Sequence, residues 1–421
     1  MFACSVSLPA VVIPILVIVG VGLAQSSPAA AGAPASQPVQ LVLPPSGPLA
    51  FVGGSGANAK NAEAVLKEFA QAGFTHSWAA VTDLDEDQTP LFDAATATGI
   101  RLIFKQQGLK VTALDVARRF KDHPALAGYM LMDEPGAADF PALTKEARDV
   151  LAEDTNPAHL VLVNLYPVGA TNEQLGVKPY AGYSDYVYKF LSEVPVNLIS
   201  YDCYPIKRLA VLPGWYQNLD MGFQAMRRSK LPLWVWIASV GMDLTPDPTL
   251  GSFRLQMYNN LAYGATGIEH FTYHNHAGMR QACIERDGSR SPTYYMVQQV
   301  HKDLQAQAGV FVGSDIRRVR WAGANRPPEV EALQPRGGIL TLEAGGQGAI
   351  VSELWKDNYR FLVIVNQDYL EPMPLSATWR DRLAVGLVQK DGSVKMLPEP
   401  KLDMRVDPGD AAILMWQDRA R

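Results

Sequence analysis

The sequence has few cysteines and histidines and no motif that would gather metal ligands. Its 421 residues include three cysteines and seven histidines, with neither a Cys-x-x-Cys nor a His-Glu-x-x-His pattern. Zinc sites are built from such closely spaced thiolate and imidazole ligands. His274 and His276 are only two residues apart, but no third ligand can be placed beside them. We therefore predict no metal and no other cofactor.

An excess of positive charge is also missing. The chain carries 37 lysines and arginines against 42 aspartates and glutamates, and its formal net charge is −5. Proteins that bind nucleic acid need a concentrated basic face to neutralise phosphates. The composition therefore gives no reason to expect a nucleic-acid partner.

The N-terminal region lacks charge and lacks a hydrophobic run of membrane-spanning length. No charged side chain precedes Lys60, and the apolar stretch 11–24 is shorter than the roughly 20 residues that a membrane helix needs. Small residues at 22–24 fit a signal-cleavage site, and an Ala/Pro/Ser/Gln-rich stretch follows. We predict a signal peptide over 1–24, a disordered linker over 25–45, and an exported protein, periplasmic or extracellular, without a stable membrane span. The alternatives are an uncleaved anchor and a misassigned start codon, because the usual positive n-region is absent.

Eight short, nearly continuous hydrophobic runs follow the linker. Runs of this kind are typical of parallel strands that are covered on both faces. They are Leu49–Gly53, Thr75–Ala80, Arg101–Lys105, Ala127–Asp133, His159–Leu165, Asn197–Asp202, Leu233–Ser239 and Gly267–Tyr273. Helical patterns such as Asn61–Ala72 and Arg254–Tyr263 separate them, each followed by a glycine. Strand and helix alternating eight times predicts an α/β fold, a (β/α)8 TIM barrel over 46–312.

A doubly wound open sheet is the alternative arrangement for alternating strands and helices. Such a sheet usually carries a glycine-rich phosphate loop after its first strand. The segment Phe51–Gly56 contains three glycines but does not fit G-x-G-x-x-G. The pattern therefore favours the closed barrel.

The pattern changes after Gly313 to short alternating runs separated by turn signals such as Asp407-Pro408-Gly409. Alternation with such turns predicts a C-terminal antiparallel β-sandwich over 313–421. The expected strands are Ile316–Trp321, Gly338–Leu342, Ala349–Leu354, Tyr359–Asn366, Leu383–Leu387 and Ala411–Trp416.

Removal of the signal peptide would leave two cysteines, Cys203 and Cys283. Cys203 follows the sixth predicted barrel strand and Cys283 lies beyond the eighth, so both belong to the same rim. In an oxidising compartment they could form a disulfide. Two unpaired thiols are the equally reasonable alternative.

Acidic residues stand at the ends of predicted barrel strands, where the active sites of such barrels lie. Asp133 and Glu134 close the fourth strand, Asp202 closes the sixth, and Glu269 lies within the eighth. Hydrolysis of a glycosidic bond needs two carboxyl groups, one to donate a proton and one to attack or to activate water. We therefore predict a glycosidase.

Glu134 is the predicted proton donor, because partial burial against an apolar strand and Pro135 would raise its pKa into the range of a general acid. An ordinary rim salt bridge is the alternative. Asp133, which points the opposite way along the strand, is predicted to support the site. Asp202 is the preferred second carboxylate, ahead of Glu269 and Asp243.

Aromatic and hydrogen-bonding residues gather at the same strand ends. Sugar rings present flat C–H faces that stack on aromatic side chains. The residues predicted to bind substrate are Asp133, Asn164, Tyr166, Tyr201, Tyr204, Trp236, Glu269, Tyr273 and His274.

Several segments resemble bacterial exported barrel proteins related to the family 42 β-galactosidase barrel. The likeness rests on Gly128–Pro135, Val163–Pro167, Ile199–Pro205, Arg254–Tyr258 and Asn260–Tyr273, and it covers about Leu49 to Gln305. The resemblance implies a glycoside hydrolase-like barrel with an acid/base glutamate at Glu134. One departure is clear: the position after the seventh strand, where the retaining clan keeps its nucleophile, holds no glutamate.

The sequence therefore predicts a carbohydrate-cleaving glycoside hydrolase. The alternative is a carbohydrate-binding barrel that has lost the second carboxylate and no longer cleaves its ligand. A barrel hydrolase that depends on a metal is a third possibility, which the scarcity of histidine ligands disfavours.

Overall fold

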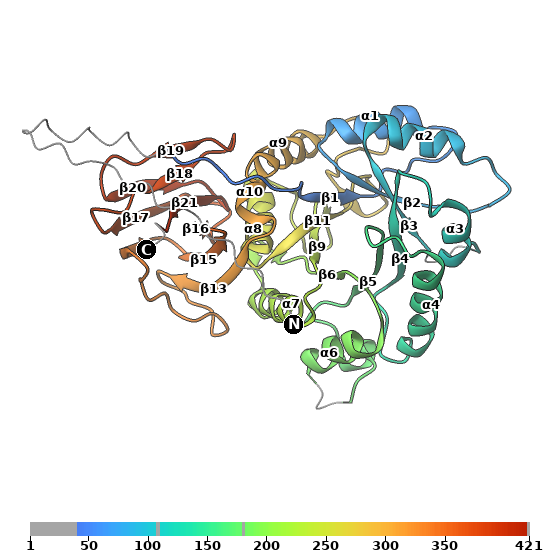
Figure 1. Cartoon of the computed structure of the whole chain (residues 1–421), viewed down its shortest axis with the longest axis horizontal. Helices are drawn as coiled ribbons and strands as arrows, with labels where there is room; N and C mark the ends of the chain where they lie inside the picture. Colours follow the sequence, from blue (N-terminus) through green and yellow to red (C-terminus); the bar gives the residue numbers. More distant parts are fainter. Residues whose placement is uncertain (1–39, 107–109, 179–181, 419–421) are drawn as a thin grey trace, which may run out of the picture. The chain divides into compact units, whose positions relative to one another are not determined.

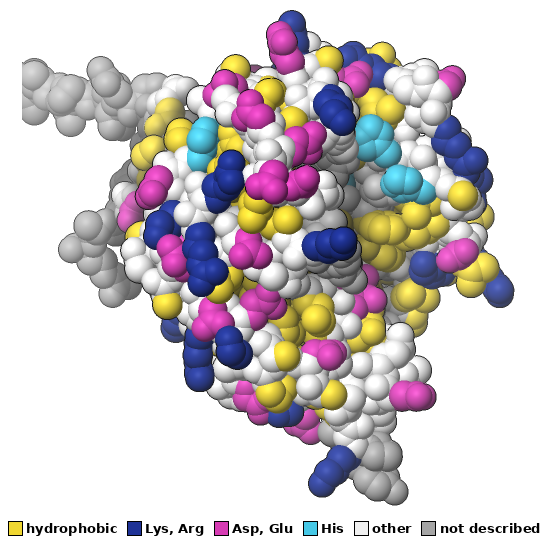
Figure 2. Space-filling view, turned by 90° about the vertical axis from the view of Figure 1, so that its right-hand side faces the viewer, with side chains coloured by type: hydrophobic (Ala, Val, Ile, Leu, Met, Phe, Trp, Pro, Cys, Tyr) yellow, Lys and Arg dark blue, Asp and Glu magenta, His cyan; other side chains and the backbone are white. Residues whose placement is uncertain are grey.

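The structure, a computed structural model, describes residues 40–106, 110–178 and 182–418, and residues from Gln40 onward form one compact unit (Figure 1). The predicted signal peptide and most of the predicted linker lie outside the described residues. No helix among the described residues is both long and apolar enough to cross a membrane. Charges of both signs are interspersed over the face shown in Figure 2, which is hollowed beside hydrophobic and histidine side chains.

Eight parallel strands close into a barrel, as the alternating pattern predicts, and the open-sheet alternative is wrong. Their order around the barrel is β1-β11-β9-β6-β5-β4-β3-β2. The strands are β1 Ala50–Gly53, β2 His76–Ala79, β3 Arg101–Lys105, β4 Leu126–Asp133, β5 Leu160–Leu165, β6 Ile199–Asp202, β9 Leu233–Ala238 and β11 Ala265–Phe271. Each covers one of the eight predicted runs. The barrel interior is filled by side chains that include Val52, Met130, Leu162 and Trp234.

Helices surround the barrel, and most of them bury an apolar face against it. They are α1 Ala62–Gln71, α2 Thr89–Thr98, α3 Ala113–Phe120, α4 Phe140–Glu153, α5 Asn172–Leu175, α6 Tyr183–Glu193, α7 Gly214–Ser229, α8 Leu250–Ala262, α9 Pro292–Ala306 and α10 Ala308–Phe311. Helix α1 shows how the sequence sets the buried face and the end of such a helix. Leu66 and Phe69 are its buried stripe, and Gly73 follows it with a φ of 83°, which favours glycine.

Helix α8 differs from the others because its buried residues include nearly every position from Gly251 to Ala262. A helix that is covered all round lies between two layers. One side faces the barrel, and on the other Ser352 of the sandwich donates a hydrogen bond to the carbonyl of Ala262 at 2.7 Å. The barrel and the C-terminal strands are therefore joined through α8.

The C-terminal region is a sandwich of two antiparallel sheets with a core between them. The sheet orders are β13-β15-β16-β21-β18-β19 and β14-β17-β20. Their strands are β13 Asp315–Ala322, β14 Ile339–Ala344, β15 Ala349–Lys356, β16 Tyr359–Asn366, β17 Met373–Trp379, β18 Gly386–Val388, β19 Val394–Met396, β20 Lys401–Val406 and β21 Ala411–Gln417. The six predicted strands are present. Strands β17, β19 and β20 were not predicted, because charged, polar and proline residues interrupt their hydrophobic runs.

Two short strand pairs lie on the rim at the C-terminal ends of the barrel strands. A hairpin of β7 Ile206–Lys207 and β8 Ala210–Val211 follows β6, and β10 Gly241–Met242 pairs with β12 Met279–Arg280. Cys203 and Cys283 are both buried and free. Of the two alternatives, the structure therefore has the unpaired thiols and not the disulfide.

Candidate active site

A cavity of about 380 Å³ opens at the C-terminal ends of the barrel strands. All eight barrel strands, or the residues that directly follow them, contribute its walls. The lining residues are Gly54, Trp78, Lys105, Asp133, Glu134, Asn164, Asp202, Tyr204, Trp236, His270, Phe271 and Thr272. Three carboxyl groups therefore share one small space, which is where the sequence predicts the active site.

Glu134 stands directly after β4 with its backbone in the left-handed region, at a φ of 49°. Its amide donates a hydrogen bond to the carbonyl of Asn164 at 2.8 Å, which fixes the turn that leads out of the strand. Burial, followed by the charge of Asp133, raises the pKa of the Glu134 carboxyl. This glutamate therefore retains a proton to higher pH than an exposed one would.

Asp202, the last residue of β6, lines the same cavity as Glu134, and each of these two carboxyl groups affects the pKa of the other. Burial raises the pKa of Asp202 to about 8, and the charges of Glu134 and Asp133 add to the effect. The amide of Asn164 donates a weaker hydrogen bond to Asp202 at 3.4 Å. Two carboxyl groups in one small cavity cannot both be ionised cheaply, and the raised pKa keeps Asp202 protonated near neutral pH.

Asp133 is held on the other side of Asn164. It accepts a hydrogen bond from the Asn164 amide at 2.8 Å and pairs with Lys105, whose Nζ lies 3.3 Å away. The Asp133 carboxylate thus has a compensating cation in Lys105. Among the described residues, Glu134 and Asp202 have no such ion pair. Asn164, on the strand between β4 and β6, links all three acids.

Glu269 occupies a different place from the other acids. It is fully buried inside the barrel and accepts a hydrogen bond from the Ser200 hydroxyl at 2.7 Å. Burial raises its pKa to about 8. Glu269 does not line the cavity, so the structure does not bring this predicted binding residue into contact with the space that substrate would enter.

Two indoles form part of the cavity wall, Trp78 on β2 and Trp236 on β9 beside Asp202. Trp78 and Trp236 stack with ring centroids 5.3 Å apart and an interplanar angle of 5°. Among the described residues, neither indole nitrogen has a hydrogen-bond partner, although both are buried. Tyr204 stacks on Phe271 at 5.5 Å. Unpaired buried donors are costly, and a hydroxyl-rich ligand in the cavity would satisfy them.

Two predicted binding residues, Tyr201 and Tyr273, lie outside the cavity. The Tyr201 ring packs so closely on α7 that a Cβ at Gly222 would be 2.6 Å from it. Tyr273 packs edge-on against Phe69 and Phe74, with centroids 4.8 Å and 5.4 Å away. Both side chains fill the layer between barrel and helices and do not line the cavity that substrate would enter.

The remaining predicted residues lie near the cavity. Tyr204, Trp236, Asn164 and Asp133 line it, whereas Tyr166 borders the acids without lining it; burial and the nearby Glu134 raise the Tyr166 pKa. The prediction missed Lys105 and His270 as lining residues. Lys105 ends β3, so the rule that selected the acids at strand ends would also have selected it.

A second cavity of about 650 Å³ continues the first across the ends of β1 and β2. The two share Gly54, Trp78, Lys105 and Thr272. His274 lines this extension, and its Nε2 lies 2.8 Å from the carbonyl of Ser55. The site is therefore a cleft longer than the acidic cavity alone. Among the described residues, no group of three His, Cys, Asp or Glu side chains could hold a metal ion.

No protein-family model and no curated protein matches the chain. Solved structures do. A catalytic mutant of Gan42B, a GH42 β-galactosidase from G. stearothermophilus, has a TM-score of 0.57 at 10% identity over 88% of this chain and 98% of that one. An Anoxybacillus α-amylase has a TM-score of 0.50 at 10% identity over 87% and 92%.

A β-galactosidase from the psychrophilic Marinomonas ef1 is a further match, with a TM-score of 0.46 and 9% identity over 62% of this chain. The alignment spans 60% of that enzyme's length. Together with the closed barrel, the Gan42B match confirms the fold that the sequence resemblance predicts: the chain has a (β/α)8 barrel of the type found in glycoside hydrolases.

Proposed function

We propose that this protein is a glycoside hydrolase in which Glu134 donates a proton to the leaving oxygen and Asp202 is the second carboxyl group. The observation that carries the proposal is that Glu134 and Asp202, each with a raised pKa, line the same cavity at the barrel mouth. Glycosidases need one protonated and one ionised carboxyl group at the same time. A pair that shares a single proton is in that state over a wide pH range.

The separation of the two carboxyl groups decides the course of the reaction. Carboxyl groups lie about 5 Å apart in retaining glycosidases and about 6.5–9.5 Å apart in inverting ones. In the free protein Asp202, whose pKa burial raises to about 8, holds a proton near neutral pH, and we propose that a sugar entering the cavity moves this proton to Glu134. As the glycosidic C–O bond breaks, this proton passes to the leaving oxygen. The Asp202 carboxylate then bonds to the anomeric carbon or removes a proton from the attacking water.

The two stacked indoles of the cavity wall support a carbohydrate as the substrate. Trp78 and Trp236 offer a flat apolar surface with unpaired N–H donors. Carbohydrate C–H faces and hydroxyl groups match these two properties. Asn164, Asp133 and Lys105 supply further hydrogen bonds on the acidic side.

Sugar release from a panel of neutral and charged glycans tests the proposal, with wild type beside Glu134→Gln. We expect release by wild type and at least a ~10²-fold lower rate in the variant, the usual contribution of a general acid. Glu63→Gln, an exposed change on α1, is the matched control and should leave the rate unchanged. Equal rates in wild type and Glu134→Gln would contradict the assignment of the proton donor. The anomer first released, followed by NMR, distinguishes nucleophilic from base catalysis by Asp202.

We also propose that the protein is exported, on the strength of the uncharged apolar N-terminus alone. Expression of the full chain in a bacterial host, followed by N-terminal sequencing of the periplasmic or secreted fraction, tests this. Cleavage near Ala24 is the expected result. A full-length product that stays in the cytoplasm would contradict it.

A further inference from the structure

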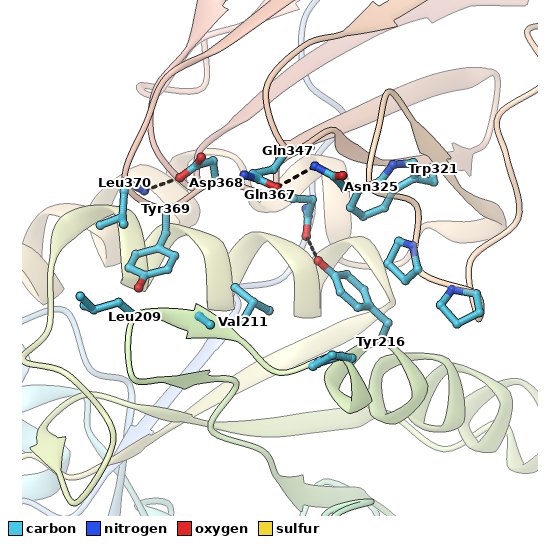
Figure 3. Close-up of a pocket in the computed structure, with 14 residues that line it drawn as sticks. Leu209, Val211, Tyr216, Trp321, Asn325, Gln347, Gln367, Asp368, Tyr369 and Leu370 are labelled. Atoms are coloured by element: carbon cyan, nitrogen blue, oxygen red, sulfur yellow. Dashed lines mark hydrogen bonds between the residues drawn. The ribbon is translucent and has the colours of Figure 1, made fainter.

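A separate pocket of about 490 Å³ lies where the barrel rim meets the sandwich (Figure 3). The β7–β8 hairpin, the start of α7 and three sandwich loops form it. Its lining residues are Leu209, Ala210, Val211, Pro213, Tyr216, Trp321, Asn325, Pro327, Pro328, Gln347, Gln367, Asp368, Tyr369 and Leu370. We call it the junction pocket. It shares no lining residue with the catalytic cleft.

The back wall of the junction pocket is held in place by buried groups. Tyr216 meets Trp321 edge to face, with ring centroids 5.8 Å apart. The Tyr216 hydroxyl donates to Gln367 at 3.0 Å, and Gln367 in turn donates to Asn259 of α8 at 3.1 Å. Because each of these groups is fixed by another, the pocket is formed before any ligand arrives.

Tyr369 is the observation that points to a ligand. Its side chain is 6% exposed, yet among the described residues its hydroxyl has no hydrogen-bond partner. Figure 3 shows the ring reaching from the sandwich toward the hairpin, with its hydroxyl end directed to Leu209. A buried phenol usually finds a partner, and leaving it unpaired costs about 1–3 kcal/mol. A ligand in the pocket would supply that partner.

Further polar groups face the same space. Asn325 donates to Gln347 at 2.9 Å, and this bond uses only one polar atom of each amide. Asp368 uses one carboxylate oxygen, Oδ1, to accept the backbone N–H groups of Leu370 and Glu371, at 2.9 Å and 3.0 Å. The amide oxygen of Asn325, the amide nitrogen of Gln347 and the second carboxylate oxygen of Asp368 remain. Together they offer a ligand both hydrogen-bond acceptors and a donor.

The rest of the lining is apolar, and none of it is cationic. Leu209 and Leu370 are 65% and 52% exposed, and three prolines also line the pocket. No lysine or arginine lines the pocket, so it lacks the groups that recognise an anion. The lining therefore fits a neutral ligand with apolar faces and many groups that both donate and accept hydrogen bonds.

We propose that the junction pocket binds a neutral saccharide at a site distinct from the catalytic cleft. Sugar hydroxyls donate and accept at once, which matches the Asn325–Gln347 amides, Asp368 and Tyr369. The sugar's C–H faces lie against the leucine and proline side chains. The site holds one part of a glycan on the protein surface while another part can enter the cleft. This binding does not depend on whether Glu134 catalyses hydrolysis.

Calorimetric titration with neutral tetrasaccharides of glucose and galactose tests the proposal. The titrated protein is the full chain carrying Glu134→Gln and Trp236→Ala, which cannot turn the sugar over and has an impaired cleft. We expect at least one tetrasaccharide to bind with a stoichiometry of one. Adding Asn325→Ala and Gln347→Ala should weaken that binding at least tenfold, since two hydrogen-bonding side chains are lost. Asn358→Ala, in an exposed turn of the sandwich, is the matched control and should leave it unchanged.

Tyr369→Phe gives a second readout that a purely structural role would not produce. It removes only the unpaired hydroxyl, so saccharide affinity should fall about threefold to tenfold while the thermal unfolding midpoint stays equal or rises. The proposal is overturned if no tetrasaccharide binds the doubly substituted protein, or if the junction substitutions leave binding intact. It is likewise overturned if a proline-rich peptide binds the pocket and the saccharides do not.

Discussion

The two halves of the barrel mouth differ sharply in chemistry. The half built by β4, β5 and β6 carries Asp133, Glu134, Asn164 and Asp202, all joined by hydrogen bonds. The other half carries the stacked indoles Trp78 and Trp236 together with Phe271. One half can move protons, whereas the other offers apolar surface.

The same difference between the two halves marks a departure from the retaining clan that the sequence resembles, because one expected acid is missing. Strand β9, the seventh of the barrel, ends at Ala238 without an acid, and Trp236 faces the cavity instead. An acid there would lie opposite Glu134. Here the acids among the described residues that line the cavity, Asp133, Glu134 and Asp202, are gathered on one side.

Glu134→Gln is expected to have the largest effect, because it removes the proton donor from the acidic half. Hydrolysis should fall by roughly 10²–10⁴-fold, whereas affinity for substrate, measured by calorimetry, should change little because the indole half is intact. A variant that loses affinity and rate in equal proportion would show that the two halves do not have separate roles.

Asp202→Asn is expected to lower the rate by about 10²-fold and to move the pH profile. In wild type the shared proton is lost as pH rises toward the Asp202 pKa of about 8, which sets the alkaline limb. In the variant the group that titrates near 8 is absent and Glu134 alone remains, so the alkaline limb of kcat/KM should shift down. An unchanged limb would exclude proton sharing.

The same substitution should alter how stability depends on pH. The folded-state pKa of Asp202 lies above the unfolded value of about 3.9, so its contribution to stability is fully present below pH 4 and is lost as pH rises toward 8. Asp202→Asn should therefore raise the unfolding midpoint relative to wild type by about 2–4 °C at pH 9, with little difference at pH 4. Thermal scans at both pH values provide the measurement.

Trp236→Phe and Trp236→Ala examine the apolar half. The phenylalanine variant keeps a flat surface and loses only the indole N–H, so KM should rise about threefold to tenfold with kcat nearly preserved. The alanine variant also loses the surface, and its KM should rise further. A fall in kcat with constant KM in both variants would place the indole in the chemistry rather than in binding.

Glu269→Gln is expected to have the smallest effect on the reaction. The residue is buried beneath the cavity with a pKa raised to about 8 by burial. The amide should keep the hydrogen bond from Ser200 and should stabilise the protein at pH 9 relative to wild type, with the sign derived above for Asp202. Turnover near neutral pH should stay within about threefold. A large loss of activity would make Glu269 a participant.

The eight barrel strands could be predicted because each is a nearly continuous hydrophobic run, which only a strand covered on both faces requires. Strand parity could also have excluded Tyr201: Ser200 and Asp202 point into the barrel, so the residue between them points outward. The weakly patterned β20, with Lys401, Asp403 and Arg405 on its exposed face, depends on its neighbour β17 and could not be predicted locally.

The effect of Glu134 and Asp202 on each other's pKa could not be predicted from the sequence. The residues are separated by a complete strand, β5, and their approach depends on the turn of Glu134 around Asn164. Sequence positions place both acids on the same rim but do not say whether they face each other. The proton shared by the pair is therefore a property of the assembled barrel.

The left-handed backbone of Glu134 has a consequence for the protein as a whole. A non-glycine residue with a φ of 49° is held in a sparsely populated conformation, at a cost of order 1 kcal/mol or more. Asparagine and glycine adopt this conformation more readily. Selection for folding alone would therefore replace Glu134, and an inactive Glu134→Gly or Glu134→Asn protein should outlast the native one on heating. The proposed catalytic role of Glu134 therefore comes with a cost in thermal stability.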